Sequence, residues 1–235
     1  MGELLYEGKA KQVYATDDPA IVMVHYKDDA TALNGLKKGT IVGKGAINNQ
    51  MSNYMFKLME QNGIPTHFVQ QLNARDTLVK RVQIVPLEVI VRNVAAGSLA
   101  SRLGVAEGTP MDPVVLEFCY KNDELGDPMV NTSHILAAKL ATQQEVDTLR
   151  NMALRVNEVL KTRLLEANLR LIDFKIEFGR LPDGTILLAD EISPDTCRLW
   201  DMDTGEKLDK DRFRRDLGHT EEAYQEVMRR LGLEA

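Results

Sequence analysis

The sequence is poor in cysteine and has no long apolar run. Its 235 residues include only two cysteines, Cys119 and Cys197, and neither has a second cysteine at metal-site or redox-motif spacing. A disulfide framework is therefore excluded, and a reducing compartment is expected. No segment reaches the roughly 20 apolar residues of a membrane-spanning helix, and the N-terminus lacks the apolar core of a secretory signal. We expect a cytoplasmic protein with no membrane partner.

Positive charge is also scarce. The chain has 29 Lys and Arg against 35 Asp and Glu, a formal net charge of −6. Because nucleic-acid binding needs a clustered excess of Lys and Arg, no nucleic-acid partner is expected. There is no GxxxxGK[ST] motif and no Gly-rich dinucleotide fingerprint, and the four histidines have no metal-ligand spacing. If the ligand is an anion, its site must be locally basic inside an acidic protein.

The elements that are present indicate an α+β fold. In the first half of the chain, the patterns predict strands over 4–26, a helix over 47–59 closed by Gly63 and Pro65, two strands over 78–92 bent at Pro86, and a short helix after Gly97. In the second half, they predict a long helix opened by the capping box Thr142 to Glu145, a hairpin over 171–192, and a basic helical tail ending near Gly232. Short connections favour antiparallel pairing. We place a domain boundary near Pro86, which gives units 1–85 and 86–235.

The segment "LIDFKIEFG", residues 171–179, alternates charged and apolar residues. Asp173, Lys175 and Glu177 are two residues apart, and Ile172, Phe174, Ile176 and Phe178 occupy the positions between them. Side chains on a strand alternate between the two faces. The three charges should therefore share one face of a strand, and the apolar residues should share the other.

A tight turn should bring two acids together on this hairpin. Pro182-Asp183-Gly184 is a turn signal; a four-residue loop over 182–185 would set Glu177 across from Asp190. Carboxylates about 5 Å apart repel by roughly 3 kcal/mol, and Mg²⁺ would offset this repulsion. A slip of one residue would place Glu191 there instead. The alternative is a surface hairpin whose acids pair with Lys175 and a neighbouring Arg.

Three other charged segments are candidates for ligand contacts. Arg92 ends an apolar strand and precedes Gly97-Ser98 at a helix start, which is typical of a phosphate cradle, although the Gly-Ser pair could be only an N-cap. "YEGKAKQVY" resembles a turn folded over phosphates, but the signal is weak. "YKNDELGDP", residues 120–128, is a polar loop of the kind that is more often plain surface.

Two long segments in the right order carry a resemblance to a known family. "VIVRNVAAGS" (89–98) and "LIDFKIEFG" (171–179) resemble the signature segments of the SAICAR synthetases of purine biosynthesis, and the similarity runs from "YEGKAKQVY" through "DKDRFRRDLG". The resemblance implies an N-terminal mainly antiparallel β domain that binds ATP and a larger α+β domain for substrate and metal, loosely like the ATP-grasp enzymes, with the active site in the cleft between them.

The resemblance also implies the chemistry. These ligases join the carboxylate of carboxyaminoimidazole ribonucleotide (CAIR) to the amine of L-aspartate while ATP is hydrolysed to ADP and phosphate, with Mg²⁺ as the metal. Oligomers are common in the family, so a homo-oligomer is expected. Two rival functions are a small-molecule kinase with the same ATP and Mg²⁺ site and a nucleotide-binding module without chemistry.

Site residues follow from the resemblance by position. For ATP, it assigns Lys9 and Lys11 to the phosphates, the strand at Lys80 with the backbone of Arg81 and Val82 to adenine, and Glu88 to the ribose. It assigns Glu177 and Asp190 to Mg²⁺ and places Lys175 near the reacting carboxylate. It assigns Arg92, Ser98, Arg198 and Arg214 to the CAIR phosphate, and the loop with Lys121, Asp123 and Asp127 to aspartate. Glu177, Asp190 and Lys175 are the expected catalytic residues.

Overall fold

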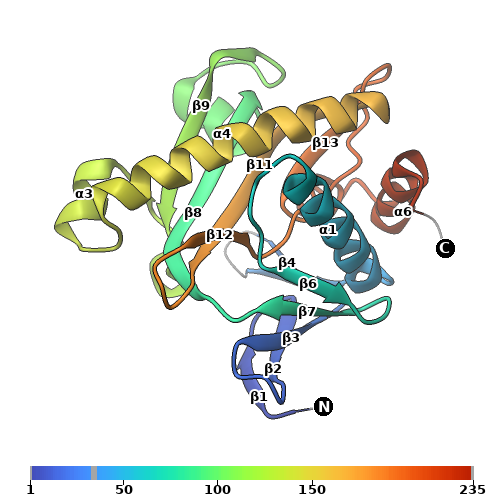
Figure 1. The fold of residues 1–235 in the computed structure, drawn as a ribbon. Helices are drawn as coiled ribbons and strands as arrows, with labels where there is room; N and C mark the ends of the chain where they lie inside the picture. The colour runs from blue at the N-terminus through green and yellow to red at the C-terminus, as the bar shows by residue number, and fades with distance from the viewer. Residues whose placement is uncertain (1, 33–35, 234–235) are drawn as a thin grey trace.

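The computed structural model describes residues 2–32 and 36–233, which form two antiparallel sheets and a small hairpin (Figure 1). The first sheet contains β1 (Leu4–Glu7), β2 (Lys11–Ala15), β3 (Ile21–Tyr26), β6 (Phe68–Gln71) and β7 (Asp76–Lys80), in the order β1-β2-β3-β7-β6. The second contains β8 (Gln83–Val94), β9 (Pro110–Tyr120), β10 (Met129–Val130), β11 (Leu169–Arg180), β12 (Ile186–Ala189) and β13 (Cys197–Asp201). Its order is β10-β9-β8-β11-β12, and β13 also pairs with β11. The hairpin is β4 (Asp29–Ala32) with β5 (Lys37–Thr40).

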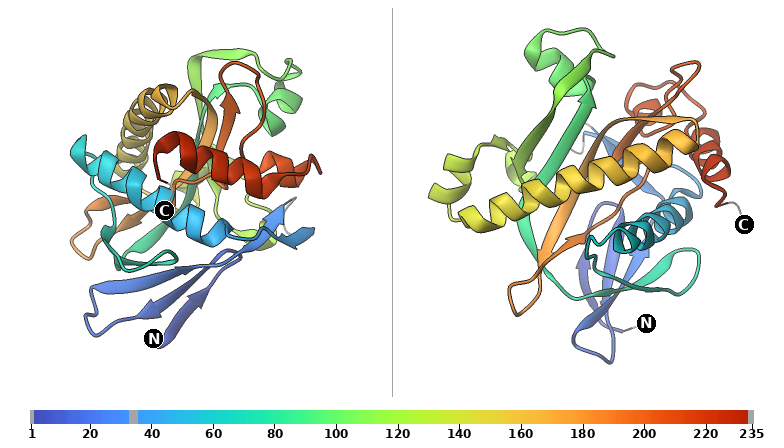
Figure 2. Two further views of the ribbon diagram at one scale, coloured as in Figure 1. Left: turned by 90° about the vertical axis from the view of Figure 1, so that its right-hand side faces the viewer. Right: turned by 45° about the horizontal axis from the view of Figure 1, so that its top comes forward.

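The helices are α1 (Lys44–Gln61), α2 (Gly97–Leu103), α3 (Thr132–Ala137), α4 (Gln143–Glu166), α5 (Asp211–Arg214) and α6 (Thr220–Leu231), with a 3-10 turn at Asp123–Leu125. The long helix α4 lies across β8 and β11 (Figure 2). Its predicted capping box is confirmed, since the backbone N–H of Glu145 donates to Thr142 Oγ1 at 3.2 Å and the N–H of Thr142 donates to Glu145 Oε2 at 2.8 Å. Within 2–32 and 36–233, no helix combines the length and the apolar character needed to cross a membrane. The α+β prediction is confirmed.

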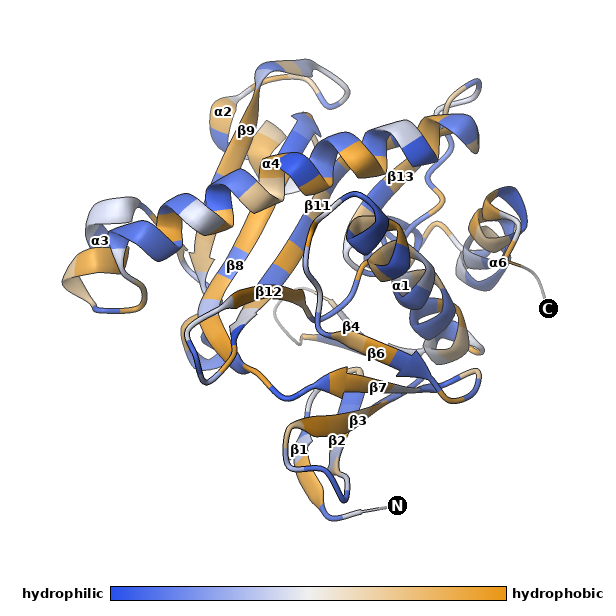
Figure 3. Ribbon diagram, viewed as in Figure 1, coloured by the Kyte–Doolittle hydropathy of each residue, from blue (hydrophilic) through white to orange (hydrophobic). Residues whose placement is uncertain are grey.

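Strand β11 contains both hydrophilic and hydrophobic residues along its length (Figure 3). Phe174, Ile176 and Phe178 are buried in the main core under α4, so the predicted alternation holds over this part of the strand. It fails at Ile172, because a bulge between Leu171 and Asp173 shifts the register. Leu171 therefore enters the main core, and Ile172 packs in a second cluster with Val94 and Trp200.

The predicted strand break at Pro86 is wrong. The break falls at residues 81–82 between β7 and β8, and β8 continues through Pro86. The pairing of β8 with β11 shifts between Ile84 and Glu88, where a residue without an N–H is tolerated in a sheet. The division into domains at residues 85 and 86 stays a prediction.

A backbone seam joins the two sheets. The N–H of His67 donates to the carbonyl of Leu188 at 2.9 Å, and the N–H of Leu188 donates to the carbonyl of Pro65 at 3.0 Å. Thr66 and Leu188 form a parallel bridge. The segment that leads into β6 is thus bonded to β12, directly before Asp190.

Candidate active site

Three adjoining cavities run from the first sheet to the polar face of the large sheet. An apolar cavity of about 460 Å³ shares Lys11, Lys121, Glu177 and Asp190 with a central cavity of about 370 Å³. The central cavity in turn shares Glu88, Lys175, Asp195 and Arg214 with a basic cavity of about 270 Å³. The shared walls make the three cavities neighbours, and most of the residues on these walls are charged.

The apolar cavity is walled by the first sheet and the connection to the second. Val13, Val22 and Val79 line it together with the predicted residues Lys80, Arg81 and Val82. The backbone N–H of Arg81 already donates to the carbonyl of Ala20 at 2.7 Å. Of the backbone groups of Arg81, the carbonyl is therefore the one left for a ligand. Val82 approaches β11 so closely that a Cβ on Gly179 would lie 2.2 Å from Val82 Cγ2. The glycine that ends "LIDFKIEFG" therefore allows this wall to form.

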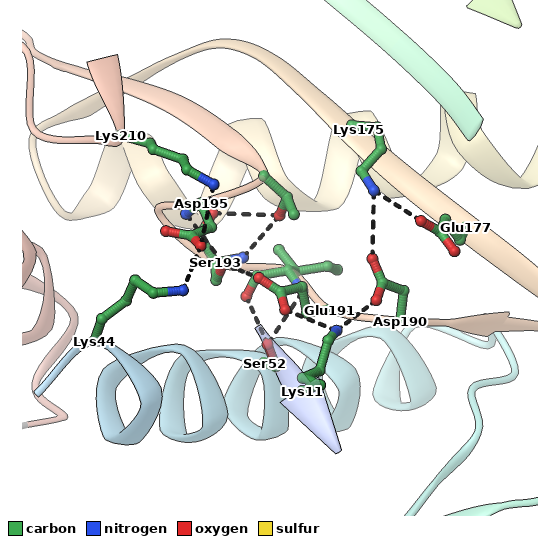
Figure 4. A network of polar contacts seen from close by, with 12 residues as sticks. Lys11, Lys44, Ser52, Lys175, Glu177, Asp190, Glu191, Ser193, Asp195 and Lys210 are labelled. Atoms are coloured by element: carbon green, nitrogen blue, oxygen red, sulfur yellow. Dashed lines mark hydrogen bonds and ion pairs between the residues drawn. The ribbon is translucent and has the colours of Figure 1, made fainter. Parts of the chain in front are cut away.

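Lys175 forms ion pairs with several acids of the central cavity (Figure 4). Its Nζ lies 2.8 Å from Glu177 Oε1 and 3.6 Å from Asp190 Oδ2. It also lies 3.2 Å from Glu88 Oε1. Burial alone would lower the pKa of Lys175, but Glu177, Asp190 and Glu88 raise it well above its usual value. The structure brings Glu88 to this cluster rather than to the wall of the apolar cavity, where a ribose contact from the adenine side would be expected.

The predicted hairpin register is wrong by one residue. Arg180, not Leu181, pairs with Ile186, so Glu177 faces Ala189. The turn is one residue longer than a Pro182–Thr185 loop, because Leu181 N–H donates to Thr185 O at 2.9 Å outside the ladder. Neither Asp190 nor Glu191 lies opposite Glu177; both follow the end of β12. The alternative of a surface hairpin is wrong for Glu177, which is only 3% exposed, although both acids do pair with Lys175 as that alternative expected.

Asp190 reaches the cluster through a left-handed backbone conformation. Its φ is 61°, which ends β12 and turns the carboxylate toward Lys175 and Lys11. Lys11 pairs with Asp190 and, at 2.7 Å, with Glu191 Oε2. Burial alone would raise the pKa of Asp190, but Lys11 and Lys175 lower it. Both predicted metal ligands thus contact Lys175, and Asp190 also pairs with Lys11. They do not face each other across a ladder.

The polar loop after β9 closes over this cluster. Lys121 Nζ donates to Glu177 Oε1 at 3.0 Å, and Lys9 Nζ donates to Asp123 Oδ1 at 2.6 Å. Asp127 Oδ1 accepts from the N–H of Asn122 at 2.8 Å and so fixes the loop. All three predicted loop residues line the central cavity, as does Lys9.

Four predicted phosphate contacts meet in the basic cavity, which is lined by Arg92, Ser98, Arg198 and Arg214. Ser98 is not an N-cap, since that position is Ala96; its Oγ accepts from Arg92 Nη2 at 3.3 Å. A Cβ on Gly97 would lie 2.4 Å from Arg198 Nη2. Glycine is therefore required for the guanidinium to lie against this turn.

Buried acids hold these arginines in place. Asp173 Oδ2 accepts from Arg92 Nη1 at 2.9 Å and from Arg198 Nη1 at 2.8 Å. Asp211 Oδ2 accepts from Arg198 Nε at 3.0 Å, and its Oδ1 accepts from Arg214 Nη1 at 2.8 Å. Burial would lower the pKa of Arg198, but Asp173 and Asp211 raise it. The first acid of "LIDFKIEFG" thus orients two guanidinium groups toward the cavity.

Sequence reasoning missed the network around Asp195. Lys44, at the start of α1 and fully buried, donates to Asp195 Oδ2 at 2.8 Å. Tyr224 of α6 donates to Oδ1 at 2.5 Å, and Lys210 lies 3.5 Å from Oδ2. These residues come from three separate parts of the chain. The only sequence signal was the run of charged residues in "SPDTCRLWD" and "DKDRFRRD".

His67 on the apolar cavity gives a testable pH dependence. Burial, together with the nearby Lys11, lowers its pKa to about 3. Because the unfolded chain takes up a proton near pH 6.5 and the folded protein does not, the free energy of unfolding should fall by about 1.4 kcal/mol per pH unit as the pH drops below 6.5. Urea unfolding at pH 7 and 5 should show this loss in the wild type and not in His67→Gln. The exposed control His219→Gln should keep it, and equal slopes in all three proteins would contradict the assignment.

The chain is similar to known proteins over nearly its whole length. The sequence profile of the family described as SAICAR synthetase matches residues 4–231. A phosphoribosylaminoimidazole-succinocarboxamide synthase from Coprothermobacter proteolyticus is 62% identical over 230 residues, which cover 98% of each chain.

Two solved structures are also similar. The synthase of the same name from Ehrlichia chaffeensis superposes with a TM-score of 0.97 at 45% identity, covering 99% of this chain and 100% of that one. A type-2 SAICAR synthetase in complex with ADP gives a TM-score of 0.95 at 46% identity, covering 99% and 98%. The chain therefore belongs to the SAICAR synthetase family and is a ligase.

Proposed function

We propose that this ligase joins the carboxylate of CAIR to the amine of L-aspartate at the expense of ATP, in de novo purine biosynthesis. The observation that carries the proposal is the row of three cavities with Lys175, Glu177 and Asp190 where they meet. The apolar cavity suits a nucleobase, the highly charged central cavity suits a phosphate chain, and the arginine-lined basic cavity suits a sugar phosphate. A related SAICAR synthetase was solved with ADP, which supports nucleotide binding.

The apolar cavity suits adenine, and its opening toward Lys11 suits the phosphates. Valine side chains line the space beside residues 80–82, which matches an aromatic base held by apolar contacts and backbone. Lys11 stands on the wall shared with the central cavity. We expect Lys9 and Lys11 to contact the phosphates, while Arg92, Ser98, Arg198 and Arg214 hold the CAIR phosphate through charge-assisted hydrogen bonds.

The acids of the central cavity fit a hard divalent cation. Glu177 and Asp190 surround one lysine ammonium, so a cation is already favoured between them. In the described residues no group of three or more His, Cys, Asp or Glu is arranged for a metal, which suits Mg²⁺ because it commonly takes one or two carboxylates and completes its shell with phosphate oxygens and water. When bound, Mg²⁺ would neutralise charge on the nucleotide phosphates.

The reaction needs activation because a carboxylate oxygen is a poor leaving group. In the first step a CAIR carboxylate oxygen forms a bond to the γ-phosphorus, and the bond from this phosphorus to ADP breaks. In the second, the aspartate amine bonds to the acyl carbon, phosphate leaves, and the amine gives up a proton. Lys175, on the wall shared with the basic cavity, would stabilise charge on the reacting carboxylate. Lys121, Asp123 and Asp127 are the loop residues that would meet aspartate.

A phosphate-release assay that omits each substrate in turn tests the function. Phosphate should appear only when ATP, CAIR and aspartate are all present, with one phosphate per SAICAR formed. A stable phosphorylated product without aspartate would instead indicate a small-molecule kinase. ATP binding without any phosphate release would indicate a nucleotide-binding module.

The turn at Gly8–Lys11 is the candidate lid. It is held by a hydrogen bond from the N–H of Gly8 to Lys11 O at 2.8 Å and by the exposed pair of Lys9 with Asp123. An acyl phosphate must be shielded from water, so closure over the phosphates is expected. Hydrogen exchange in residues 8–11 should slow clearly when ATP is added. Equal protection with and without ATP would count against a lid.

The location and assembly state remain proposals as well. Both cysteines are free and buried. Such thiols need no oxidising compartment, which supports a cytoplasmic location. A homo-oligomer stays a prediction.

A further inference from the structure

Aspartate carries two carboxylates, so besides Lys121 it needs a second cation in the central cavity that ATP and CAIR do not use. Six cationic side chains line this cavity in the described structure: Lys9, Lys11, Lys121, Lys175, Lys210 and Arg214. Lys11 and Lys121 also line the apolar cavity, and Lys175 and Arg214 also line the basic cavity. Lys9 and Lys210 are the two that line the central cavity alone.

These two lysines differ in how well they are paired. Lys9 forms a close ion pair with Asp123, at 2.6 Å. Lys210 has one long contact in the described residues, 3.5 Å to Asp195 Oδ2. Its side chain is only 14% exposed. A nearly buried ammonium with so little compensation is costly, and an incoming carboxylate would supply the missing charge.

The reason for this weak pairing is that Asp195 is already engaged by other residues (Figure 4). Lys44, which is fully buried, donates to Oδ2 at 2.8 Å. The hydroxyl of Tyr224 donates to Oδ1. The carboxylate therefore cannot turn fully toward Lys210. Burial lowers the pKa of Lys210, and Asp195 offsets this only in part. Tyr224 and Lys44 thus act as positioning residues that keep the ammonium available to the cavity.

We propose that Lys210 binds a carboxylate of the amino-acid substrate and so sets the specificity of the ligase for an acidic amine donor. This inference rests on the function proposed above. Asp123 and Asp127 line the same cavity and have the charge to attract the ammonium of that substrate. The loop after β9 and the segment before α5 would then contact opposite charges of one amino acid.

The test compares Lys210→Met with the wild type by steady-state kinetics for each of the three substrates. Met keeps the aliphatic stem and removes the charge. The KM for aspartate should rise roughly 10- to 100-fold, the range for a lost hydrogen bond to a charged group, while the KM values for ATP and CAIR stay within about twofold. The inhibition constant of succinate, which has both carboxylates but no amine, should rise by the same factor. Lys210→Arg keeps the charge and should restore part of the affinity.

A second variant tests the positioning role without touching the cavity. Tyr224→Phe should raise the KM for aspartate several-fold in the wild-type background and not at all in Lys210→Met, because the two residues act through one contact. Tyr54→Phe is the matched control, since Tyr54 bonds Arg163 between α1 and α4, and it should leave the KM unchanged.

Three results would overturn the proposal. In Lys210→Met, these are a rise in the KM for CAIR or ATP in place of aspartate, a change in kcat without any change in KM, and an unchanged inhibition constant for succinate. If the wild-type enzyme releases no phosphate with all three substrates, the proposed function fails first. If it does release phosphate and Lys210→Met leaves aspartate binding intact, only this inference fails.

Discussion

Replacing Glu177 by Gln or Asp190 by Asn should lower kcat/KM for ligation by about 10²- to 10³-fold, the usual cost of removing one preorganised electrostatic group. Each substitution removes one carboxylate from the pair proposed to hold Mg²⁺. The fold should survive, because Lys175 keeps Glu88 and one of the two acids, and Lys11 keeps Glu191. Asn also tolerates the left-handed backbone at position 190, so the loss at this position would be chemical rather than conformational.

The measurement is turnover against Mg²⁺ concentration, with circular dichroism as a check of folding. Both variants should need more Mg²⁺ than the wild type for half-maximal activity. Asp183→Asn, at the exposed tip of the same hairpin, is the control and should behave like the wild type. Folded variants with near-normal turnover at ordinary Mg²⁺ would refute the assignment.

Arg92→Ala should raise the KM for CAIR by about 100-fold and leave the KM for ATP nearly unchanged. Arg92 is 4% exposed, lines the basic cavity and is held by Glu117 at 2.8 Å and Asp173 at 2.9 Å. Loss of a buried, paired charge in a binding site costs about 2–5 kcal/mol. The free energy of unfolding should also fall, by about 3 kcal/mol, because two buried acids lose a partner.

Arg102→Ala separates these two effects. Arg102 binds the same Glu117 at 2.6 Å, but its side chain is 37% exposed and does not line the cavity. It should cost little stability and leave both KM values unchanged. An equal rise in the KM for CAIR and for ATP in Arg92→Ala would indicate a general structural defect and not a phosphate pocket.

Local patterns predicted the elements well. The capping box at Thr142 and the alternation of Phe174, Ile176 and Phe178 depend on neighbours in sequence. The register between β11 and β12 was missed by one residue because the length of the turn depends on where Leu181 leaves the ladder. The bulge at Ile172 was missed because it is set by pairing with β13, which follows about 25 residues later.

The site was predictable to the extent that a known signature marks its residues. Arg92 and Glu177 lie inside the two signature segments, and both line the cavities. The Asp195 network carries no such mark. Lys44, Asp195 and Tyr224 are far apart in sequence and meet only because α1 and α6 pack side by side. No periodicity or spacing in one sequence reports a contact of that kind.

The seam at Leu188 holds the two sheets together at one edge of the site. Its backbone hydrogen bonds connect the two sheets close to Asp190. We therefore expect the sheets to separate by a hinge rotation about this edge. The pair of Lys9 with Asp123 is exposed and worth little energy, so it would separate first. We expect nucleotide and product to enter and leave on the side of the Lys9–Asp123 pair. Asp190, which lies close to the seam, should keep its position throughout the catalytic cycle.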